Sequence, residues 1–364
     1  MRALPFDLRL PVILGPMSGA GICTPELVAA VSNRGAFAIF AAQYLDPDAV
    51  DRAIRRIREL TTLPFGINFF SPSSTQPLTG DVDPQLQLLA PIHNRLGLDP
   101  PALPTQLPDH FPAYVDLALE HRIPVVSFTM GVFPADVVDR FRARNVFLMG
   151  TATTVAEAQE LEQTGIDAIV AQGADAGGHR GTFDPDLPGL VGTMSLVPQI
   201  VDAVSVPVIA SGGIMDGRGV VAALALGASA VQMGTAFLTT RESGAPEVYK
   251  QSVLAATDDS TTLTRAFSGR WARGIRNEFI ERSEASAAQP ISFPWQNSLT
   301  GPMRRAAAQQ GQSGLLSLWA GQGTRMSRDI SASELIDRLA EEIRATQRSL
   351  AEKSFVAKEY RSAQ

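Results

Sequence analysis

The sequence predicts an α/β protein built on a (β/α)8 TIM barrel with a smaller second domain. Eight short apolar runs alternate with amphipathic helical stretches along the chain. Several runs are apolar without alternation, which is typical of parallel strands covered on both faces. Two long segments, 71–112 and 243–323, break this rhythm. Because long structureless loops are uncommon in compact domains, we assign both segments to a second domain that caps the barrel mouth.

The barrel elements are expected in regular order along the chain. The runs predicted to be strands are 12–14, 37–40, 65–68, 125–128, 146–149, 168–170, 208–210 and 230–233. Helices are predicted between most of them, at 25–33, 47–60, 135–143, 154–164 and 217–226. The barrel would then comprise 1–70, 113–242 and 324–364, and the smaller capping or substrate domain 71–112 and 243–323.

A last helix is predicted from Ser331 to about residue 358. Glu334 follows Ser331 by three residues, which completes a capping-box pattern at the start of the helix. Four apolar residues then recur at helical spacing, namely Ile336, Leu339, Ile343 and Leu350. We expect this apolar face to pack back on the barrel.

Composition excludes several classes of protein. The chain has 364 residues and a net charge of −6 at pH 7, which disfavours nucleic acid and anionic membranes as partners. One cysteine, Cys23, excludes an intrachain disulfide and a multi-cysteine metal site. The most apolar window, 220–238, contains Gly, Ser, Gln and Thr, so we expect a buried helix and strand there rather than a membrane span. With no hydrophobic signal segment at its start, the protein is expected to be cytoplasmic. Whether it is a homodimer is left open.

The segment 172–183 is the predicted place of chemistry. It follows the sixth expected strand, contains four glycines, and carries His179 directly after Gly177 and Gly178. Glycine lets the backbone approach a ligand closely, and histidine exchanges a proton near neutral pH. No second histidine or cysteine stands at ligand spacing, so no metal site is predicted. The segment lacks the Gly-x-Ser-x-Gly elbow of serine hydrolases. Arg180 is expected to pair with Asp175 or Asp184, and attraction of an anionic substrate is the alternative.

Two consecutive glycine turns predict a phosphate site. Ser211-Gly212-Gly213 follows the seventh expected strand and precedes a helix, and Gln232-Met233-Gly234-Thr235 closes the eighth. In TIM barrels the loops after strands 7 and 8 commonly bind phosphate through backbone N–H groups and a helix N-terminus. Each motif is weak alone, but two in consecutive units at these strands favour phosphate binding.

Other polar or soft residues at strand ends are candidates for holding a flat ring. Pro16 and Met17 follow the first expected strand and could offer backbone and a thioether to one face of the ring. Asn68 and Gln172 end the third and sixth strands, and their amides could pair with ring edges such as those of a flavin. A plain turn at Pro16-Met17, and structural capping by either amide, are the alternatives.

Taken together, these motifs resemble the nitronate monooxygenases, formerly called 2-nitropropane dioxygenases. The resemblance covers most of the chain and is carried by Gln172-Gly173-x-x-Ala176-Gly177-Gly178-His179-Arg180-Gly181, Ala210-Ser211-Gly212-Gly213, Gln232-Met233-Gly234-Thr235, Pro16-Met17, Phe65-Gly66-Ile67-Asn68, 268–277 and Trp319-Ala320-Gly321-Gln322. One departure is Asp175, where the family often has Glu.

The resemblance implies a flavin-binding TIM barrel with non-covalent FMN. It implies that His179 is the catalytic residue. It also implies that FMN is held by Pro16, Met17, Asn68, Gln172, Gly177, Gly178, Ser211, Gly212, Gly213, Gln232, Met233, Gly234 and Thr235. The implied reaction is oxidation of an alkyl nitronate, such as propionate 3-nitronate, by O₂ to a carbonyl compound and nitrite. Whether neutral nitroalkanes are accepted, and whether His179 acts as a base or as a positive partner to an anion, stay open.

Two other functions compete with this one. An FMN-dependent enoyl-ACP reductase shares the Ala-Gly-Gly-His loop and the barrel, but would need NAD(P)H and an acyl-carrier partner. The continuation 180–183 and the stretch 319–322 favour the monooxygenase. A barrel that only binds a phosphorylated ligand, without catalysis, belongs to a different class and would be colourless.

Overall fold

A closed barrel of eight parallel strands forms the centre of the computed structural model, which describes residues 8–19 and 21–353. The strands follow one another around the barrel as β1 (Val12–Leu14), β2 (Phe37–Ala41), β3 (Gly66–Phe70), β4 (Val125–Thr129), β5 (Phe147–Ala152), β6 (Ala168–Gln172), β8 (Val208–Ser211) and β9 (Ala230–Met233). Pairing of β9 with β1 closes the barrel. The predicted (β/α)8 fold is confirmed, with each strand within a few residues of its expected place.

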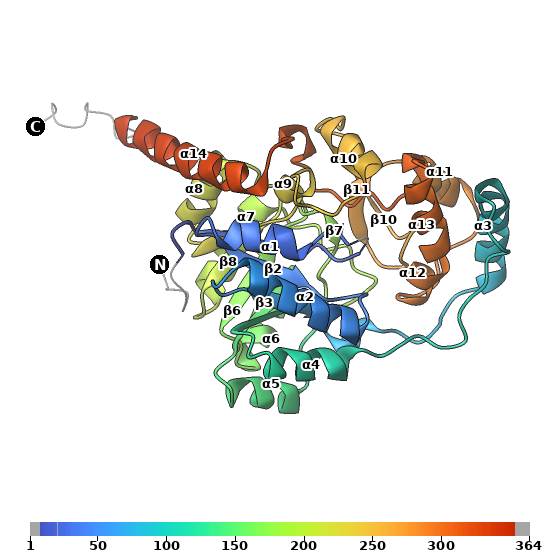
Figure 1. Cartoon of the computed structure of the whole chain (residues 1–364), viewed down its shortest axis with the longest axis horizontal. Coiled ribbons are helices and arrows are strands. Elements are labelled where there is room, and N and C mark those ends of the chain that lie inside the picture. The colour runs from blue at the N-terminus through green and yellow to red at the C-terminus, as the bar shows by residue number, and fades with distance from the viewer. Residues whose placement is uncertain (1–7, 20, 354–364) are drawn as a thin grey trace, which may run out of the picture.

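Helices surround this barrel, as Figure 1 shows. They are α1 (Pro25–Ser32), α2 (Pro47–Leu60), α4 (Phe111–Glu120), α5 (Ala135–Arg142), α6 (Val155–Gln163), α7 (Thr193–Ala203), α8 (Gly217–Ala225) and α14 (Ala332–Glu352). A short α9 (Thr235–Leu238) follows β9. Buried apolar residues of β1, β2, β4, β5, β6, β8 and β9 form a cluster that fills the barrel interior. Ligand space is therefore left only at the strand ends.

The start of α6 is tied to the loop that carries His179. Thr154 and Glu157 form a capping box, in which the Thr154 hydroxyl accepts the N–H of Glu157 and the Glu157 carboxylate accepts the N–H of Thr154. The second carboxylate oxygen of Glu157 accepts the N–H of Phe183 at 2.8 Å. One helix cap therefore also fixes the end of the loop that carries His179.

A smaller lobe lies beside the barrel at the right of Figure 1. It contains α3 (Val82–Leu96), α10 (Glu247–Leu254), β10 (Thr261–Thr264), β11 (Ala272–Ile275), α11 (Glu278–Ala285), α12 (Trp295–Leu299) and α13 (Gly301–Gln309). Three short 3₁₀ helices, η1 (Pro72–Ser74), η2 (Ser313–Leu315) and η3 (Thr324–Met326), lie in the connections. The lobe has its own core of apolar side chains from both 71–112 and 243–323. This core supports the division into two domains, which stays a prediction.

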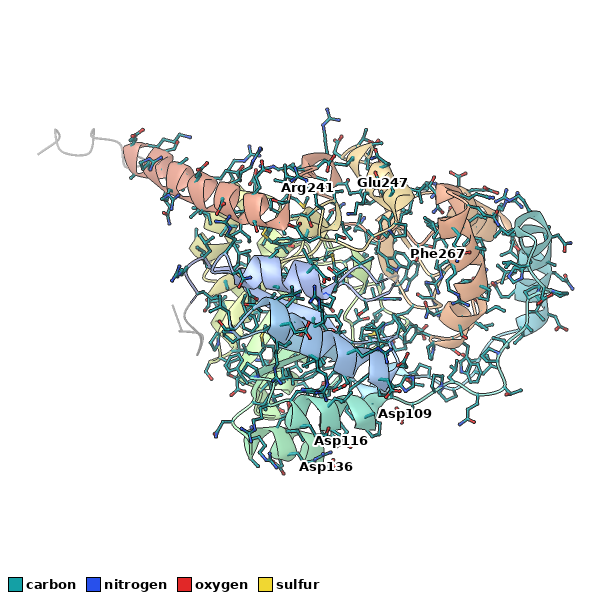
Figure 2. The ribbon with its side chains drawn as sticks, in the orientation of Figure 1. Asp109, Asp116, Asp136, Arg241, Glu247 and Phe267 are labelled. Atoms are coloured by element: carbon teal, nitrogen blue, oxygen red, sulfur yellow. The ribbon has the colours of Figure 1, made fainter. Side chains whose placement is uncertain are left out.

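Phe267 illustrates the core of the smaller lobe. It is fully buried, and Figure 2 places it among the strands and helices of this lobe. Its ring centroid lies 4.8 Å from that of Phe279 and 5.7 Å from that of Trp319. Trp319 also reaches His179, as described below, so the core of this lobe extends to the barrel mouth.

The smaller lobe and the barrel share one strand. β7 (Gly178–His179) leaves the barrel and pairs antiparallel with β11, so that His179 lies opposite Ala272. β10, β11 and β7 form a three-stranded sheet. The predicted catalytic histidine is thus held by a sheet of the smaller lobe, and the sequence pattern gave no sign of this pairing.

The final helix differs in part from its prediction. Ser331 caps α14 by accepting the N–H of Glu334 at 3.1 Å, and Ile336, Leu339 and Ile343 are buried as expected. Leu350 is 42 % exposed, so its predicted packing on the barrel is wrong. The helix ends at Glu352, and residues 354–358 of the predicted span lie outside the described residues. Among the described residues, no helix is long and apolar enough to cross a membrane.

Candidate active site

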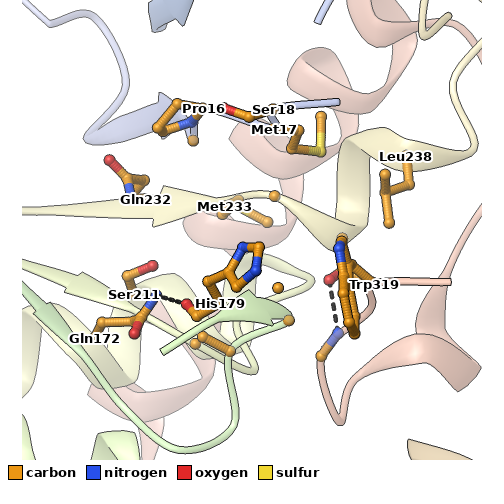
Figure 3. Close-up of a pocket in the computed structure, with 18 of the residues that line it drawn as sticks. Pro16, Met17, Ser18, Gln172, His179, Ser211, Gln232, Met233, Leu238 and Trp319 are labelled. Carbon is orange, nitrogen blue, oxygen red and sulfur yellow. Dashed lines mark hydrogen bonds between the residues drawn. The ribbon is translucent and has the colours of Figure 1, made fainter. Parts of the chain in front are cut away.

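A pocket of about 1140 Å³, counting its open mouth, lies where the barrel strands end (Figure 3). All the residues predicted for the site line it, namely Pro16, Met17, Asn68, Gln172, Gly177, Gly178, His179, Ser211, Gly212, Gly213, Gln232, Met233, Gly234 and Thr235. The structure therefore brings every one of them together, while the role of each stays a prediction.

Three polar residues stand side by side on neighbouring strands at this pocket. Gln172 of β6 is in register with Ser211 of β8, and Ser211 with Gln232 of β9. The side-chain oxygen of Gln232 is buried and accepts no hydrogen bond from the described residues. A buried acceptor without a donor is costly, so this oxygen is suited to accept one from a bound ring.

For both Asn68 and Gln172 the sequence left ring binding and structural capping open, and their side chains differ in their contacts. The Asn68 amide donates to the hydroxyl of Ser127 at 2.8 Å and still lines the pocket. The Gln172 amide donates to the carbonyl of His179 at 3.1 Å and accepts the N–H of Gly181 at 2.8 Å. Gln172 therefore holds the loop on both sides of Arg180, through His179 and Gly181. These bonds favour structural capping as the role of its side chain.

Arg180 does not pair with Asp175 or Asp184, contrary to expectation. Its guanidinium is fully buried and donates to the carbonyls of Gly173 and Gln172, each at 2.9 Å, and of Pro188 at 3.3 Å. Asp175 instead accepts the N–H and the hydroxyl of Thr193 at the start of α7. The inward-facing carbonyl groups of this loop thus need a hydrogen-bond donor, and Arg180 supplies it. Sequence spacing does not reveal this need.

The two positions before His179 require glycine for different structural reasons. A Cβ atom on Gly177 would lie 2.5 Å from the carbonyl carbon of Ala320 and from the nitrogen of Gly321. Gly177 is therefore needed for close packing against the 320–321 segment rather than against a ligand. Gly178 has a φ of 78° and no atom within 4 Å of an added Cβ, so its backbone conformation is what favours glycine.

The glycine turns after β8 and β9 leave main-chain donors free. Among the described residues, no hydrogen bond is donated by the N–H groups of Gly212, Gly213 or Gly234. The expected helix N-terminus is less available, because Asp216 caps α8 by accepting the N–H groups of Arg218 and Gly219. The free donors for an anion therefore lie in the turns themselves.

The hydroxyl of Thr235 lies beside these turns. It accepts the N–H of Gly321 at 3.0 Å, which leaves its own proton available to a ligand. The following N–H, of Gln322, donates to the carbonyl of Asp175 at 2.9 Å. The segment 320–322 is thereby held by hydrogen bonds to Thr235, after β9, and to Asp175 of the loop that carries His179.

His179 is enclosed by aromatic rings. Its ring centroid lies 5.6 Å from those of Phe293 and Trp319 and 6.3 Å from that of Phe70. Burial, together with the positive charges of Arg270 and Arg304, lowers the pKa of His179 to about 3. Nε2 is buried and has no hydrogen-bond partner among the described residues. His179 is therefore neutral at pH 7 and has a ring nitrogen free to accept a proton.

Several lining residues were not identified as site residues from the sequence. Trp319 lies across the pocket from Gln172 and Ser211 in Figure 3, and its carbonyl accepts the hydroxyl of Tyr249 at 2.6 Å. Phe70 lies two residues beyond Asn68 on β3 and also lines the pocket. Trp319 belongs to one of the quoted motifs, so a signal existed for it. Tyr249 and Phe70 had none.

The arrangement can perform acid–base chemistry next to a bound phosphorylated ring. It offers free N–H donors at one end, an unpaired amide oxygen on the strand ends and a neutral histidine among aromatic rings. None of the described pocket residues is a carboxylate or a cation. A reacting group there would meet the neutral imidazole of His179 in a dry, apolar setting.

Known proteins resemble the chain along nearly its whole length. A family model described as Nitronate monooxygenase matches residues 6–342. A "Probable nitronate monooxygenase" of Staphylococcus haemolyticus (strain JCSC1435) is 40 % identical over 342 residues, which is 93 % of this chain and 95 % of that protein. The nitroalkane oxidase of Streptomyces ansochromogenes has a TM-score of 0.89 and 39 % identity, covering 94 % of this chain and 98 % of that one. FabK of Thermotoga maritima has a TM-score of 0.75 and 28 % identity, covering 95 % and 96 %.

Proposed function

Because the chain belongs to the nitronate monooxygenase family, we propose that it is an FMN-dependent enzyme that oxidises alkyl nitronates with O₂. Two nitronate anions and one O₂ would give two carbonyl compounds and two nitrite ions: each C=N bond breaks, and each oxygen atom of O₂ becomes one carbonyl oxygen. The observation that carries the proposal is the neutral His179, with its free Nε2, in a pocket that also has unused N–H donors. The reaction needs no NAD(P)H.

The pocket residues fit FMN. The free N–H groups of Gly212, Gly213 and Gly234, with the hydroxyl of Thr235, suit a phosphate. The unpaired oxygen of Gln232 and the amide of Asn68 suit the polar edges of a flavin ring, and Pro16 and Met17 its face. When bound, FMN would supply the electron transfer between nitronate and O₂.

His179 would act as a base rather than as a cation. Its pKa, lowered to about 3, means that it carries no charge of its own at neutral pH. With a neutral nitroalkane, Nε2 could remove the proton from the carbon that bears the nitro group, so that a nitronate forms in place. With a nitronate, that step is already complete, and His179 would orient the anion in the tautomer whose Nε2 carries the proton and donates a hydrogen bond. In both cases the rings of Phe70 and Trp319 would keep water away from His179.

Oxygen consumption and nitrite release from propionate 3-nitronate test the proposal. The purified protein should be yellow, should release nitrite only in the presence of O₂, and should not need NAD(P)H. The matched variant is His179→Asn, which should keep FMN and lose most turnover with nitroethane. Unchanged turnover would assign His179 a structural role.

The rival function is distinguished by the same preparation. An FMN-dependent enoyl-ACP reductase would oxidise NADH or NADPH with an enoyl thioester and would release no nitrite. A colourless protein that takes up no FMN would point instead to a barrel that only binds a phosphorylated ligand. Either result would replace the proposed function.

A further inference from the structure

Three apolar side chains gather beside His179 without belonging to either core of the molecule. Phe70 ends β3, Met130 follows β4, and Phe293 lies just before α12 in the smaller lobe. All three are buried, and they form a cluster separate from those of the barrel and of the smaller lobe. We call Phe70, Met130 and Phe293 the apolar wall. Apolar and aromatic side chains are the usual lining of a ligand pocket, where few polar groups are needed.

The apolar wall borders the reacting end of the pocket. Phe70 and Met130 line the pocket together with His179. The ring centroid of His179 lies 6.3 Å from that of Phe70 and 5.6 Å from that of Phe293, and these two phenyl centroids lie 6.2 Å apart. None of the three wall side chains carries an N–H or O–H group. The wall therefore suits the hydrocarbon part of a molecule whose reacting atoms lie at His179.

Phe70 and Met130 reach the pocket from neighbouring strands. Side chains alternate along β3, so Phe69 belongs to the core beneath the helices, whereas Phe70 lines the pocket. Phe70 is in register with Thr129, the last residue of β4, which also lines the pocket. Met130 is the next residue along the chain. The two wall side chains of the barrel thus leave their strands side by side at its mouth.

The backbone of Met130 is held in a conformation that disfavours any residue with a Cβ. Its φ is 67°, in the left-handed region. The hydroxyl of Ser73 donates to the carbonyl of Met130 at 3.1 Å, and that of Ser71 donates to the carbonyl of Val132 at 2.6 Å. A Cβ on Gly131, between these two carbonyls, would lie 2.0 Å from the Ser73 hydroxyl oxygen. The surrounding chain thus fixes this turn and the direction of the Met130 side chain.

Met130 is one of four non-glycine residues with a positive φ among the described residues, and the four fall into two pairs. Arg122 and Asn145 follow the ends of α4 and α5, where this conformation is ordinary. Tyr44 and Met130 instead follow barrel strands, and both lie next to Phe70. Strained backbone that the surroundings enforce concentrates at functional sites. Glycine would adopt this turn more easily, which indicates that the position needs the Met130 side chain itself.

We propose that Met130, backed by Phe70 and Phe293, is a specificity-determining residue that sets how long an alkyl chain the nitronate can have. This rests on the proposed function. With the nitronate group at His179, its alkyl chain would extend along the apolar wall and its end would meet Met130, which is only 1 % exposed and has little room to move aside. Each CH₂ that fits strengthens binding about fourfold, whereas a longer chain would overlap the methionine side chain.

Ethyl nitronate and hexyl nitronate provide the direct test, because they share the reacting group and differ only in chain length. In Met130→Ala, the ratio of kcat/KM for hexyl nitronate to that for ethyl nitronate should rise about tenfold or more, since Cγ, Sδ and Cε are removed. Met130→Gly, which also relieves the φ of 67°, should show the same rise if the alanine variant folds poorly. Met130→Leu, of similar volume, should keep the ratio within about twofold. Met194→Ala, at a methionine of α7 that is 68 % exposed, is the control and should resemble the wild type.

Binding of two carboxylates separates this inference from the proposed function. Propanoate and heptanoate have the same skeletons as ethyl and hexyl nitronate, and they release no nitrite. In calorimetry with the FMN-loaded protein, Met130→Ala should strengthen the binding of heptanoate relative to propanoate by about tenfold or more.

The two failures are distinguishable. A kcat/KM ratio within about twofold of the wild type in Met130→Ala, or an equal change for both nitronates, would overturn the inference while leaving the function in place. A protein that oxidises neither nitronate, but whose preference for heptanoate still depends on Met130, would overturn the function while the apolar subsite stands.

Discussion

Substituting Gly177 by alanine should loosen the contact between the loop 172–183, which carries His179, and the segment 320–322. The new Cβ would lie 2.5 Å from main-chain atoms of Ala320 and Gly321, whereas ordinary contact begins at 3.4 Å. The two backbones must therefore separate by about 0.9 Å. Such overpacking costs about 1–3 kcal/mol, and weakening the Gly321–Thr235 and Gln322–Asp175 hydrogen bonds adds about 1 kcal/mol each.

The expected loss in the free energy of unfolding is thus about 3–5 kcal/mol, or roughly 4–7 °C in Tm for a chain of 364 residues. Thermal unfolding with and without added FMN would measure it, and FMN retention should fall because Thr235 borders the phosphate-type turn. Gly178→Ala is the control: no atom lies within 4 Å, so only its φ of 78° costs energy, about 1–2 kcal/mol. Equal stability of Gly177→Ala and the wild type would refute this account of the loop.

Three further changes test other parts of the site. His179 stays neutral in the folded protein down to about pH 3, whereas the unfolded chain takes up a proton below its ordinary pKa of 6.5. Stability that is present above pH 6.5 is therefore lost as the pH falls toward 3. In His179→Asn this loss should be smaller by about 1 kcal/mol per pH unit. The prediction is contradicted if the free energies of unfolding of variant and wild type, measured with urea, fall in parallel between about pH 4.5 and 6.5. Arg180→Met leaves three buried carbonyls without their donor and should cost about 3 kcal/mol or more in urea unfolding, and a loss below about 1 kcal/mol would mean that water replaces the guanidinium. Thr235→Val keeps the shape but removes a hydroxyl, so FMN affinity measured by fluorescence should weaken roughly tenfold; unchanged affinity would remove Thr235 from the phosphate site.

The barrel and the membership of its pocket were predictable from local pattern. Each strand is a short apolar run, and the polar or glycine residue that ends it must lie at the barrel mouth because parallel strands end together. For this reason Asn68, Ser211 and Gln232 could be placed before the structure was known. The same logic placed Gly234 after the last strand of the barrel.

What each residue does at the mouth depended on contacts far apart in sequence. Gly177 meets Ala320, Arg180 turns to carbonyls of its own loop, and His179 pairs with Ala272 in the sheet of the smaller lobe. Spacing within one motif does not encode such partners.

Anaerobic mixing of the FMN-loaded protein with propionate 3-nitronate tests the central claim most directly, with the visible absorbance of oxidised flavin as the readout. We expect that absorbance to be lost with the nitronate, to return when O₂ is admitted, and to persist when NADH or NADPH is added instead. Bleaching by NADH or NADPH with none by the nitronate would contradict it.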